Sequence, residues 1–304
     1  MKQKLELCAQ RLQGCKLIQN VPMKDYTSFR IGGPADLFLM PRNREELLQG
    51  IEAAKESQLP LTIIGNGSNM LVSDKGIEGL VIRIGSDFSG IQYDGCVQKV
   101  LAGTLLCLAA NDSLEKGLMG LEWGTGIPGT VGGAVAMNAG AYGGEIKNVL
   151  TKVECFMDGE VKHIVPTDED MAYRYSRFSA PGAVVLSAEL SLSPDDGGAK
   201  ERAREYCEYR RLKQPLSYPS AGSTFKRPEG YFAGALIEQA GLKGLSVGGA
   251  EVSTLHAGFI INTGGATFSD VFTLMKEIQD KVYDRFGVML EPEVKIIGRE
   301  VCSL

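Results

Sequence analysis

The sequence offers little from which to build a disulfide framework or a metal site. It has seven cysteines, an odd number, and no two of them are spaced Cys-x-x-Cys. Its only histidines are His163 and His256. Structural zinc sites need clustered cysteine and histidine ligands, and disulfide scaffolds need paired cysteines. We therefore predict no metal site and no disulfides, as is usual for a chain kept in a reducing compartment.

Basic charge and long apolar runs are also scarce. The net charge is -5 and the pI is about 5.3, whereas nucleic-acid-binding proteins usually carry a basic face. No apolar run approaches the roughly 18 residues of a membrane span, and residues 1–6 lack the apolar core of a signal peptide. We expect a cytoplasmic protein with no nucleic-acid or membrane partner. The oligomeric state stays open, with a monomer favoured.

Glycine, by contrast, is abundant, with 38 residues in 304. Two glycine-rich stretches stand out, residues 65–69 (Gly-Asn-Gly-Ser-Asn) and residues 124–133 (Gly-Thr-Gly-Ile-Pro-Gly-Thr-Val-Gly-Gly). Because glycine has no Cβ, such loops can line up backbone N–H groups around an anion. One such loop alone is most simply a β-turn, but two together indicate a long ligand with a diphosphate in its middle.

Apolar periodicity and capping residues predict an alternation of strands and helices in the early part of the chain. Asn43, with Glu46 three residues later, marks one helix start, and Ser269 marks another. Residues 194–198 (Pro-Asp-Asp-Gly-Gly) give the strongest linker signal. The predicted helices cover 43–58, 104–117, 199–213, 231–240 and 269–286, and the predicted strands cover 61–64, 80–84, 153–165, 183–192 and 288–297.

Residues 124–129 also spell Gly-x-Gly-x-x-Gly, and Glu145 follows at a distance suited to gripping a ribose hydroxyl. Together these features are typical of a Rossmann dinucleotide site, which needs a strand before the motif and a helix after it. Here the preceding residues 105–118 are predicted to be helical, and Pro128 removes an N–H from the turn. We therefore treat a Rossmann site as the weaker alternative.

A series of motifs, in one order along the chain, resembles a known enzyme family. The motifs are residues 28–36 (Ser-Phe-Arg-Ile-Gly-Gly-Pro-Ala-Asp), 65–69, 127–134, 138–143, 173–178 (Tyr-Arg-Tyr-Ser-Arg-Phe), 221–228 (Ala-Gly-Ser-Thr-Phe-Lys-Arg-Pro) and 290–294 (Leu-Glu-Pro-Glu-Val). Over residues 20–298 the chain is similar to the UDP-N-acetylenolpyruvoylglucosamine reductases of bacterial peptidoglycan synthesis. It is most similar to their short form, which lacks an extra substrate-binding tyrosine loop.

The resemblance implies an α+β fold with a vanillyl-alcohol-oxidase-type (PCMH-type) FAD-binding domain, which is not a Rossmann domain. This domain would consist of two subdomains, residues 1–85 and 86–196, followed by a substrate-binding domain, residues 197–304. FAD would lie between the subdomains, non-covalently because no histidine or cysteine lies in the glycine loops, and NADPH would be the co-substrate. The residues that the resemblance assigns to FAD are Ile64, Gly65, Asn66, Gly67, Ser68, Asn69, Leu71, Gly126, Ile127, Pro128, Gly129, Thr130, Gly132, Gly133, Ala134, Asn138, Gly140 and Ala141.

The implied reaction is the NADPH-dependent, FAD-mediated reduction of UDP-N-acetylglucosamine enolpyruvate to UDP-N-acetylmuramate. Hydride reaches the β-carbon of the enolpyruvyl group, and negative charge develops at the α-carbon and its carboxylate. By resemblance, Arg174 holds this charge, Ser223 protonates the α-carbon, and Glu293 assists protonation or orients the enol. Without the resemblance, the three residues are more simply a surface arginine, a turn serine and a solvated strand carboxylate. We expect Arg174 to meet the other two only when the substrate domain closes over the flavin.

The resemblance also assigns four residues to the substrate: Tyr142, Tyr173, Lys213 and Lys226. Arg211 and Lys213 are both candidates for its diphosphate, and the residues alone do not separate them. Tyr173 is equally consistent with an aromatic anchor in the core.

Three other functions stay open on the residues alone. They are a flavin oxidase of the same fold acting on a small alcohol or hydroxy acid, a Rossmann nicotinamide dehydrogenase, and a non-catalytic nucleotide-sugar-binding protein. A yellow purified protein excludes the dehydrogenase and argues against the binding protein. NADPH bleaching of the flavin separates the reductase from the oxidase.

Overall fold

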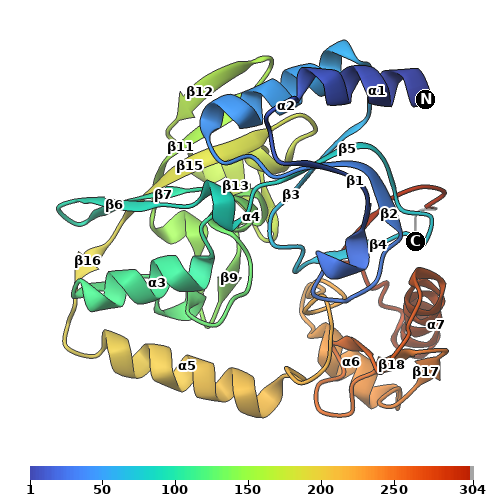
Figure 1. Ribbon diagram of the computed structural model, residues 1–304. Coiled ribbons are helices and arrows are strands. Elements are labelled where there is room, and N and C mark those ends of the chain that lie inside the picture. The colour runs from blue at the N-terminus through green and yellow to red at the C-terminus, as the bar shows by residue number, and fades with distance from the viewer. Residues whose placement is uncertain (302–304) are drawn as a thin grey trace.

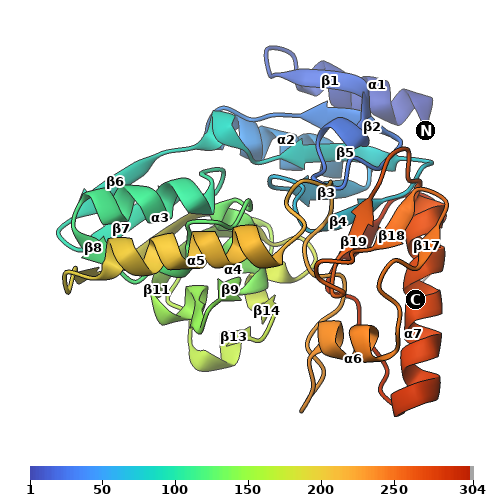
Figure 2. The ribbon, with the colours of Figure 1, turned by 90° about the horizontal axis from the view of Figure 1, so that it is seen from below.

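The computed structural model describes residues 1–301. Figures 1 and 2 show two subdomains side by side and a C-terminal lobe, coloured orange to red, packed against the first of them. The fold is α+β, as predicted, because each part combines a sheet with covering helices. Within residues 1–301, every helix is too short or too polar to span a bilayer.

The first subdomain is a four-stranded mixed sheet covered by two helices (Figure 1). The strand order is β1-β2-β5-β3, with β1 antiparallel to β2 and with both β2 and β3 parallel to β5. Its elements are α1 (Lys2–Arg11), β1 (Leu17–Pro22), β2 (Pro34–Leu39), α2 (Arg44–Glu56), β3 (Leu61–Ile64) and β5 (Ile77–Arg83). The strands predicted at 61–64 and 80–84 are both present, and the second begins at Ile77.

Helix α2 forms where its capping chemistry predicts it. The Asn43 side chain accepts a hydrogen bond from the Glu46 N–H at 2.9 Å, which satisfies one of the free donors of the first turn. Leu47 and Ile51 are buried in the core that the helix shares with the sheet. The cap and the apolar stripe thus fix both the start of α2 and the face that it buries.

The second subdomain is a five-stranded antiparallel sheet in the order β12-β11-β15-β7-β6. Its elements are β6 (Ile91–Asp94), β7 (Val97–Leu101), α3 (Leu106–Glu115), α4 (Val131–Met137), β11 (Leu150–Met157), β12 (Glu160–Ile164) and β15 (Val184–Ser191). The single strand predicted over 153–165 is wrong. The chain turns at Asp158 and Gly159, which both have positive φ (56° and 85°), so β11 and β12 form a hairpin.

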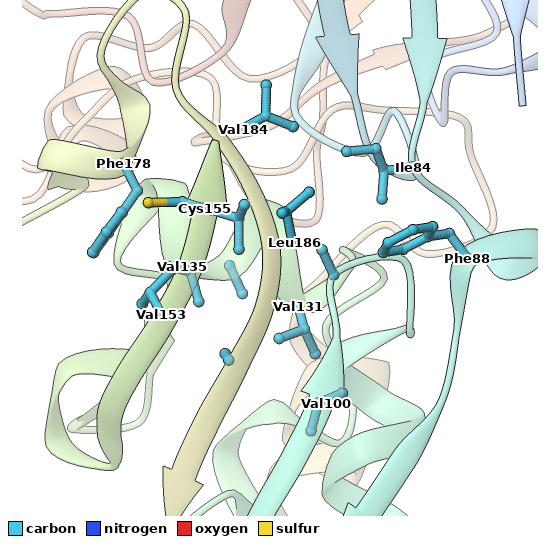
Figure 3. Close-up of a cluster of buried hydrophobic side chains, with 14 of the residues drawn as sticks. Ile84, Phe88, Val100, Val131, Val135, Val153, Cys155, Phe178, Val184 and Leu186 are labelled. Carbon is cyan, nitrogen blue, oxygen red and sulfur yellow. The ribbon is translucent and has the colours of Figure 1, made fainter. Parts of the chain in front are cut away.

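Helix α4 packs on this sheet through a dry apolar core. Figure 3 shows Val131 and Val135 of α4 gathered with Val100, Val153 and Leu186 of the strands. All five side chains are almost fully buried. This packing fixes the position of α4 and of the second glycine-rich stretch, which leads directly into it.

The predicted linker leads into α5 (Ala199–Lys213), a long helix that lies along the second subdomain (Figure 2). Ala199 and Ala203 pack against Leu114 of α3, and Arg202 forms an ion pair with the buried Glu122 at 2.7 Å. The predicted domain boundary at 196/197 stays a prediction. These contacts favour grouping α5 with residues 86–196.

The C-terminal lobe is a three-stranded antiparallel sheet, β17-β18-β19, with two helices. Its elements are α6 (Ala233–Gln239), β17 (Ser246–Val247), β18 (Ala250–Val252), β19 (Ile260–Asn262) and α7 (Phe268–Phe286). The helix cap predicted at Ser269 is wrong. Thr267 caps α7 instead, because its hydroxyl accepts from the Asp270 N–H while Asp270 accepts from the Thr267 N–H.

The end of the chain joins the C-terminal lobe to the first subdomain. Strand β20 (Lys295–Ile297) pairs in parallel with β4 (Met70–Val72), the strand that follows the first glycine-rich stretch. Only these last residues of the predicted strand 288–297 are a strand. Asn262 also donates to the Phe29 carbonyl at 3.1 Å, and Phe29 is buried in the core of the lobe.

Three further short strand pairings occur within residues 1–301. They are β8 (Leu118–Met119) with β16 (Ser193–Pro194), β9 (Gly140–Ala141) with β10 (Gly144–Glu145), and β13 (Met171–Ala172) with β14 (Tyr175–Ser176).

Candidate active site

A cavity of about 910 Å³ lies where the two subdomains and the C-terminal lobe meet. Both glycine-rich stretches line it, as do Arg174, Ser223 and Glu293. Segments far apart in the sequence therefore converge on one space that is large enough for an extended ligand.

The first glycine-rich stretch presents a row of free donors to this cavity. None of the four backbone N–H groups of residues 66–69 donates a hydrogen bond to another group within residues 1–301. Gly67 has φ 66°, and a Cβ on it would lie 2.0 Å from the Tyr26 carbonyl oxygen. Glycine is therefore required at position 67, and the loop can direct consecutive amides at an anion.

The second stretch lies against the first. The Asn66 side-chain amide donates to the Pro128 carbonyl at 2.8 Å, and a Cβ on Gly65 would lie 2.3 Å from the Thr130 hydroxyl. Thr130 in turn caps α4 by accepting from the Gly133 N–H at 3.3 Å. The two loops are thus held at a fixed spacing by direct contacts.

The second stretch is not a Rossmann turn. The 3₁₀ turn Glu122–Gly124 precedes it instead of a strand, and the neighbouring sheet is antiparallel. Glu145, which would grip a ribose in that alternative, accepts a hydrogen bond from Asn138 at 2.7 Å. The Rossmann alternative is therefore excluded.

Most of the residues predicted to bind the cofactor line the cavity. These are Ile64, Gly65, Asn66, Gly67, Ser68, Asn69, Ile127, Pro128, Gly129, Thr130, Gly132, Gly133, Ala134, Gly140 and Ala141. Leu71 is fully buried in the core and Asn138 is buried behind the cavity. Gly126 does not line the cavity either and lies beneath the Arg210 side chain.

Asn138 has a structural role, because its side chain joins two segments next to the cavity. Its amide donates to the Ala172 carbonyl at 3.0 Å, and its side-chain oxygen accepts from the Lys147 N–H at 3.0 Å. It therefore ties the end of α4 to the β13–β14 hairpin, whose turn carries Arg174. Asn138 thus acts on the site through the backbone that it positions.

Arg174 sits in a strained turn and points into the cavity. Its φ is 56°, a left-handed conformation that costs a non-glycine residue about 1–3 kcal/mol and that clusters at functional sites. Its Nε donates to Glu293 Oε1 at 2.8 Å, and its Nη2 donates to the Gly140 carbonyl at 3.2 Å. Arg174 and Glu293 are paired in this structure, in which the C-terminal lobe lies at the cavity, so the expectation that they meet only on domain closure stays a prediction.

Glu293 is brought to the cavity by pairing of two C-terminal segments. Its backbone N–H donates to the Thr224 carbonyl at 2.9 Å, and the Lys226 N–H donates to the Glu291 carbonyl at 2.8 Å. The Glu293 side chain is only 13% exposed, so Glu293 is not a solvated strand carboxylate, the simpler interpretation of its sequence. Burial raises the pKa of Glu293 above its usual value, and the Arg174 guanidinium opposes part of that rise.

This raised pKa predicts a measurable pH dependence of stability. A carboxyl whose folded-state pKa exceeds its unfolded value stabilises the fold at low pH, and that contribution is lost as the pH rises through the folded-state pKa. We expect the free energy of unfolding of the wild type, minus that of Glu293→Gln, to fall as the pH rises from about 4, near the unfolded-state pKa, through the raised folded-state pKa. Urea unfolding of both proteins across this range measures the difference, and a constant or rising difference would contradict the assignment.

Ser223 lies one residue before Thr224, which pairs with the Glu293 segment, and it lines the same cavity. Gly222 before it has φ 79°, a turn that leaves the serine at the cavity surface. The Ser223 hydroxyl makes no hydrogen bond within residues 1–301. It is therefore free to donate to a ligand.

The predicted substrate residues divide between the cavity and its surroundings. Tyr142 lines the cavity and stacks on Tyr206 with ring centroids 4.4 Å apart. Tyr173 is 51% exposed and lies outside the cavity, so it is not a core anchor. Lys226 pairs with Glu291, and Lys213 is exposed; neither lines the cavity.

Sequence reasoning missed several residues that line the cavity, among them Arg30, Tyr209, Arg210 and Lys295. Arg30 lies inside the motif at residues 28–36, and Lys295 directly follows the motif at residues 290–294. Both residues could therefore have been identified from these motifs. Tyr209 and Arg210 lie on a highly charged helix with no clear polar and apolar faces. Nothing in its sequence marks which side faces inward.

Comparisons with known proteins agree with this geometry. The family model "FAD binding domain" matches residues 35–164, and the model "UDP-N-acetylenolpyruvoylglucosamine reductase, C-terminal domain" matches residues 214–297. The UDP-N-acetylenolpyruvoylglucosamine reductase of Agathobacter rectalis is 50% identical over 93% of this chain and 94% of its own length. That of Alkaliphilus oremlandii is 48% identical over 92% of each chain. A crystal structure of the reductase from Thermus caldophilus covers 93% of this chain and 98% of its own, with 38% identity and a TM-score of 0.79.

Proposed function

The chain belongs to the UDP-N-acetylenolpyruvoylglucosamine reductase family, and we infer that it reduces the enolpyruvyl ether of a UDP-sugar with FAD as cofactor and NADPH as reductant. The observation that carries this inference is the convergence of two amide-lined loops with Arg174, Ser223 and Glu293 on one cavity. FAD, when bound, supplies the hydride chemistry that no side chain can provide.

The cavity fits a flavin dinucleotide on its own chemistry. The free N–H groups of residues 66–69 are suited to the oxygens of a diphosphate. Gly65 and Gly67 allow the backbone to pass where a Cβ would collide with Thr130 or Tyr26. Ile63, Ile84 and Val185 give the cavity apolar walls for planar rings. We place the diphosphate at the two loops.

Arg174 holds the substrate carboxylate. Its guanidinium is permanently charged and matches a carboxylate with two parallel hydrogen bonds. Its present partner is the Glu293 carboxylate, at 2.8 Å, and the substrate carboxylate would compete for the same donor. Negative charge that develops on the substrate in the transition state would then be stabilised by a donor that is already positioned, an effect typically worth about 3 kcal/mol.

Ser223 donates the proton to the α-carbon, and Glu293 orients the developing enol or supports the proton transfer. The Ser223 hydroxyl has no competing partner in residues 1–301. Burial raises the pKa of Glu293, so its protonated form persists to higher pH than that of an exposed glutamate, and that form can donate a hydrogen bond as well as accept one. The two residues approach the cavity from segments that are paired through their backbones.

Separate measurement of the two half-reactions tests this function. In anaerobic stopped-flow experiments, NADPH should bleach the flavin of the holoenzyme, and UDP-N-acetylglucosamine enolpyruvate should restore its colour. Rapid reoxidation by oxygen but not by the enolpyruvyl substrate would instead support the flavin oxidase alternative. A flavin that NADPH does not bleach would contradict the reductase.

We further propose that the enzyme is a cytoplasmic monomer. One chain supplies both glycine-rich stretches and Arg174, Ser223 and Glu293 to the cavity, and the co-substrate NADPH is a soluble metabolite. Sedimentation of the purified holoenzyme at several concentrations checks the oligomeric state.

A further inference from the structure

Among the cations that line the cavity, one that is partly buried has no negative partner within residues 1–301. Arg210, in the last turn of α5, lines the cavity and is partly buried. Its guanidinium makes no ion pair and no hydrogen bond with the groups of residues 1–301. By contrast, Arg202 and Arg204, on the same helix, are both paired with carboxylates.

The contacts of Arg210 place it beside the second glycine-rich stretch. An added Cβ on Gly126 would lie 2.7 Å from Arg210 Cδ and 3.1 Å from its Nε. The side chain therefore lies flat across the Gly126 backbone, just before residues 127–130, which line the cavity. Tyr142 lines the same cavity, and its ring stacks on Tyr206 and meets Tyr209 edge-on, both on α5.

The groups around Arg210 do not account for a partly buried positive charge at this position. Burial lowers the pKa of Arg210, and the nearby Tyr142 and Cys207 oppose that shift only in part. The helix dipole of α5 favours basic residues in its last turn. Arg211 and Lys213 lie in that turn and are exposed, so they provide this favourable interaction without a buried charge. A partly buried cation without a counter-charge is a site for an anionic ligand.

We propose that Arg210 is a diphosphate-binding residue of the active site and that Gly126, which has no Cβ, leaves the space in which its side chain lies. The inference rests on the proposed function, since it assumes that the cavity binds nucleotides. Arg210 is thus a candidate in place of Arg211 and Lys213, neither of which lines the cavity. The diphosphate could belong to FAD or to the nucleotide substrates, and the experiment below separates these sources.

The test compares Arg210→Met with Arg204→Met, an exposed arginine of the same helix, as a matched control. Apoprotein is titrated with FAD and with riboflavin by fluorescence, and holoenzyme is titrated with UDP and with NADP⁺ by calorimetry. We expect Arg210→Met to weaken at least one diphosphate ligand by about 10- to 100-fold, with riboflavin affinity unchanged. A loss for FAD assigns the residue to the cofactor, and a loss for UDP or NADP⁺ assigns it to that substrate. Arg204→Met should change none of them.

Gly126→Ala provides a second, independent variant. The φ of Gly126 is not in the left-handed region, so alanine is sterically disallowed only by the Arg210 side chain. We expect Gly126→Ala to weaken the same ligand as Arg210→Met, and the double variant to lose no more than Arg210→Met alone.

The proposal is overturned if Arg210→Met leaves all three diphosphate ligands within about threefold of the wild type, or if Arg211→Met has the larger effect. Failure of the proposed function is distinguishable, because then the wild type itself binds neither FAD nor UDP. Circular dichroism of each variant shows whether a loss of binding reflects unfolding.

Discussion

Replacing Ser223 by alanine should slow the reduction of the enolpyruvyl substrate by about 10²- to 10⁴-fold, the range that a positioned proton donor contributes. The rate at which NADPH reduces the enzyme should be unchanged, because that step needs no proton on the substrate carbon. The change removes one oxygen atom from a side chain with no hydrogen-bond partner in residues 1–301. We therefore expect no loss of stability.

Stopped-flow absorbance of the two half-reactions, in wild type and variant, measures this difference. Ser223→Cys is the informative companion, because a thiol retains a transferable proton and should restore part of the rate. If alanine slows both half-reactions equally, or if the substrate half-reaction is unaffected, Ser223 is not the proton donor.

Replacing Gly67 by alanine should abolish stable FAD binding. The added Cβ would lie 2.0 Å from the Tyr26 carbonyl oxygen, a backbone atom that cannot move aside as a flexible side chain would. The first loop must therefore shift, and its free N–H groups lose their common direction. We expect FAD to be bound at least about 100-fold more weakly, since several charge-assisted hydrogen bonds are lost together.

Gly95→Ala is the matched control for this variant. Gly95 has a similar φ of 59°, but an added Cβ there has no atom within 4 Å. Both variants carry the cost of a left-handed alanine, about 1–2 kcal/mol, and only Gly67→Ala adds a collision at the cavity. Fluorescence titration of the apoproteins with FAD compares them. Equal affinities in the two variants would show that the first loop does not hold the cofactor.

Local chemistry predicted much of the fold because several elements are specified by a few neighbouring residues. Asn43 and Glu46 mark the start of α2, and Gly287, with φ 68°, ends α7. The missed turn at Asp158 and Gly159 shows the limit of this approach. Alternation of apolar residues continues through the hairpin, so the pattern alone indicates one long strand instead of two.

Residues whose position depends on tertiary pairing could not be predicted in the same way. Glu293 alternates with apolar neighbours like a solvated strand residue, yet pairing of its segment with residues 224–226 turns it into the cavity. Arg210 and Arg211 are adjacent on a helix that is charged on most sides, and only the packing of α5 on the second subdomain decides which of them faces inward. Family motifs identified the loops, but not the role of Asn138 behind them.

The most direct test of the account is whether the protein binds FAD in the cavity between its two glycine-rich loops. The account predicts that the purified wild type shows a flavin absorbance spectrum, and that its apoprotein takes up one FAD per chain on titration. A colourless protein whose apoprotein does not bind added FAD would contradict it.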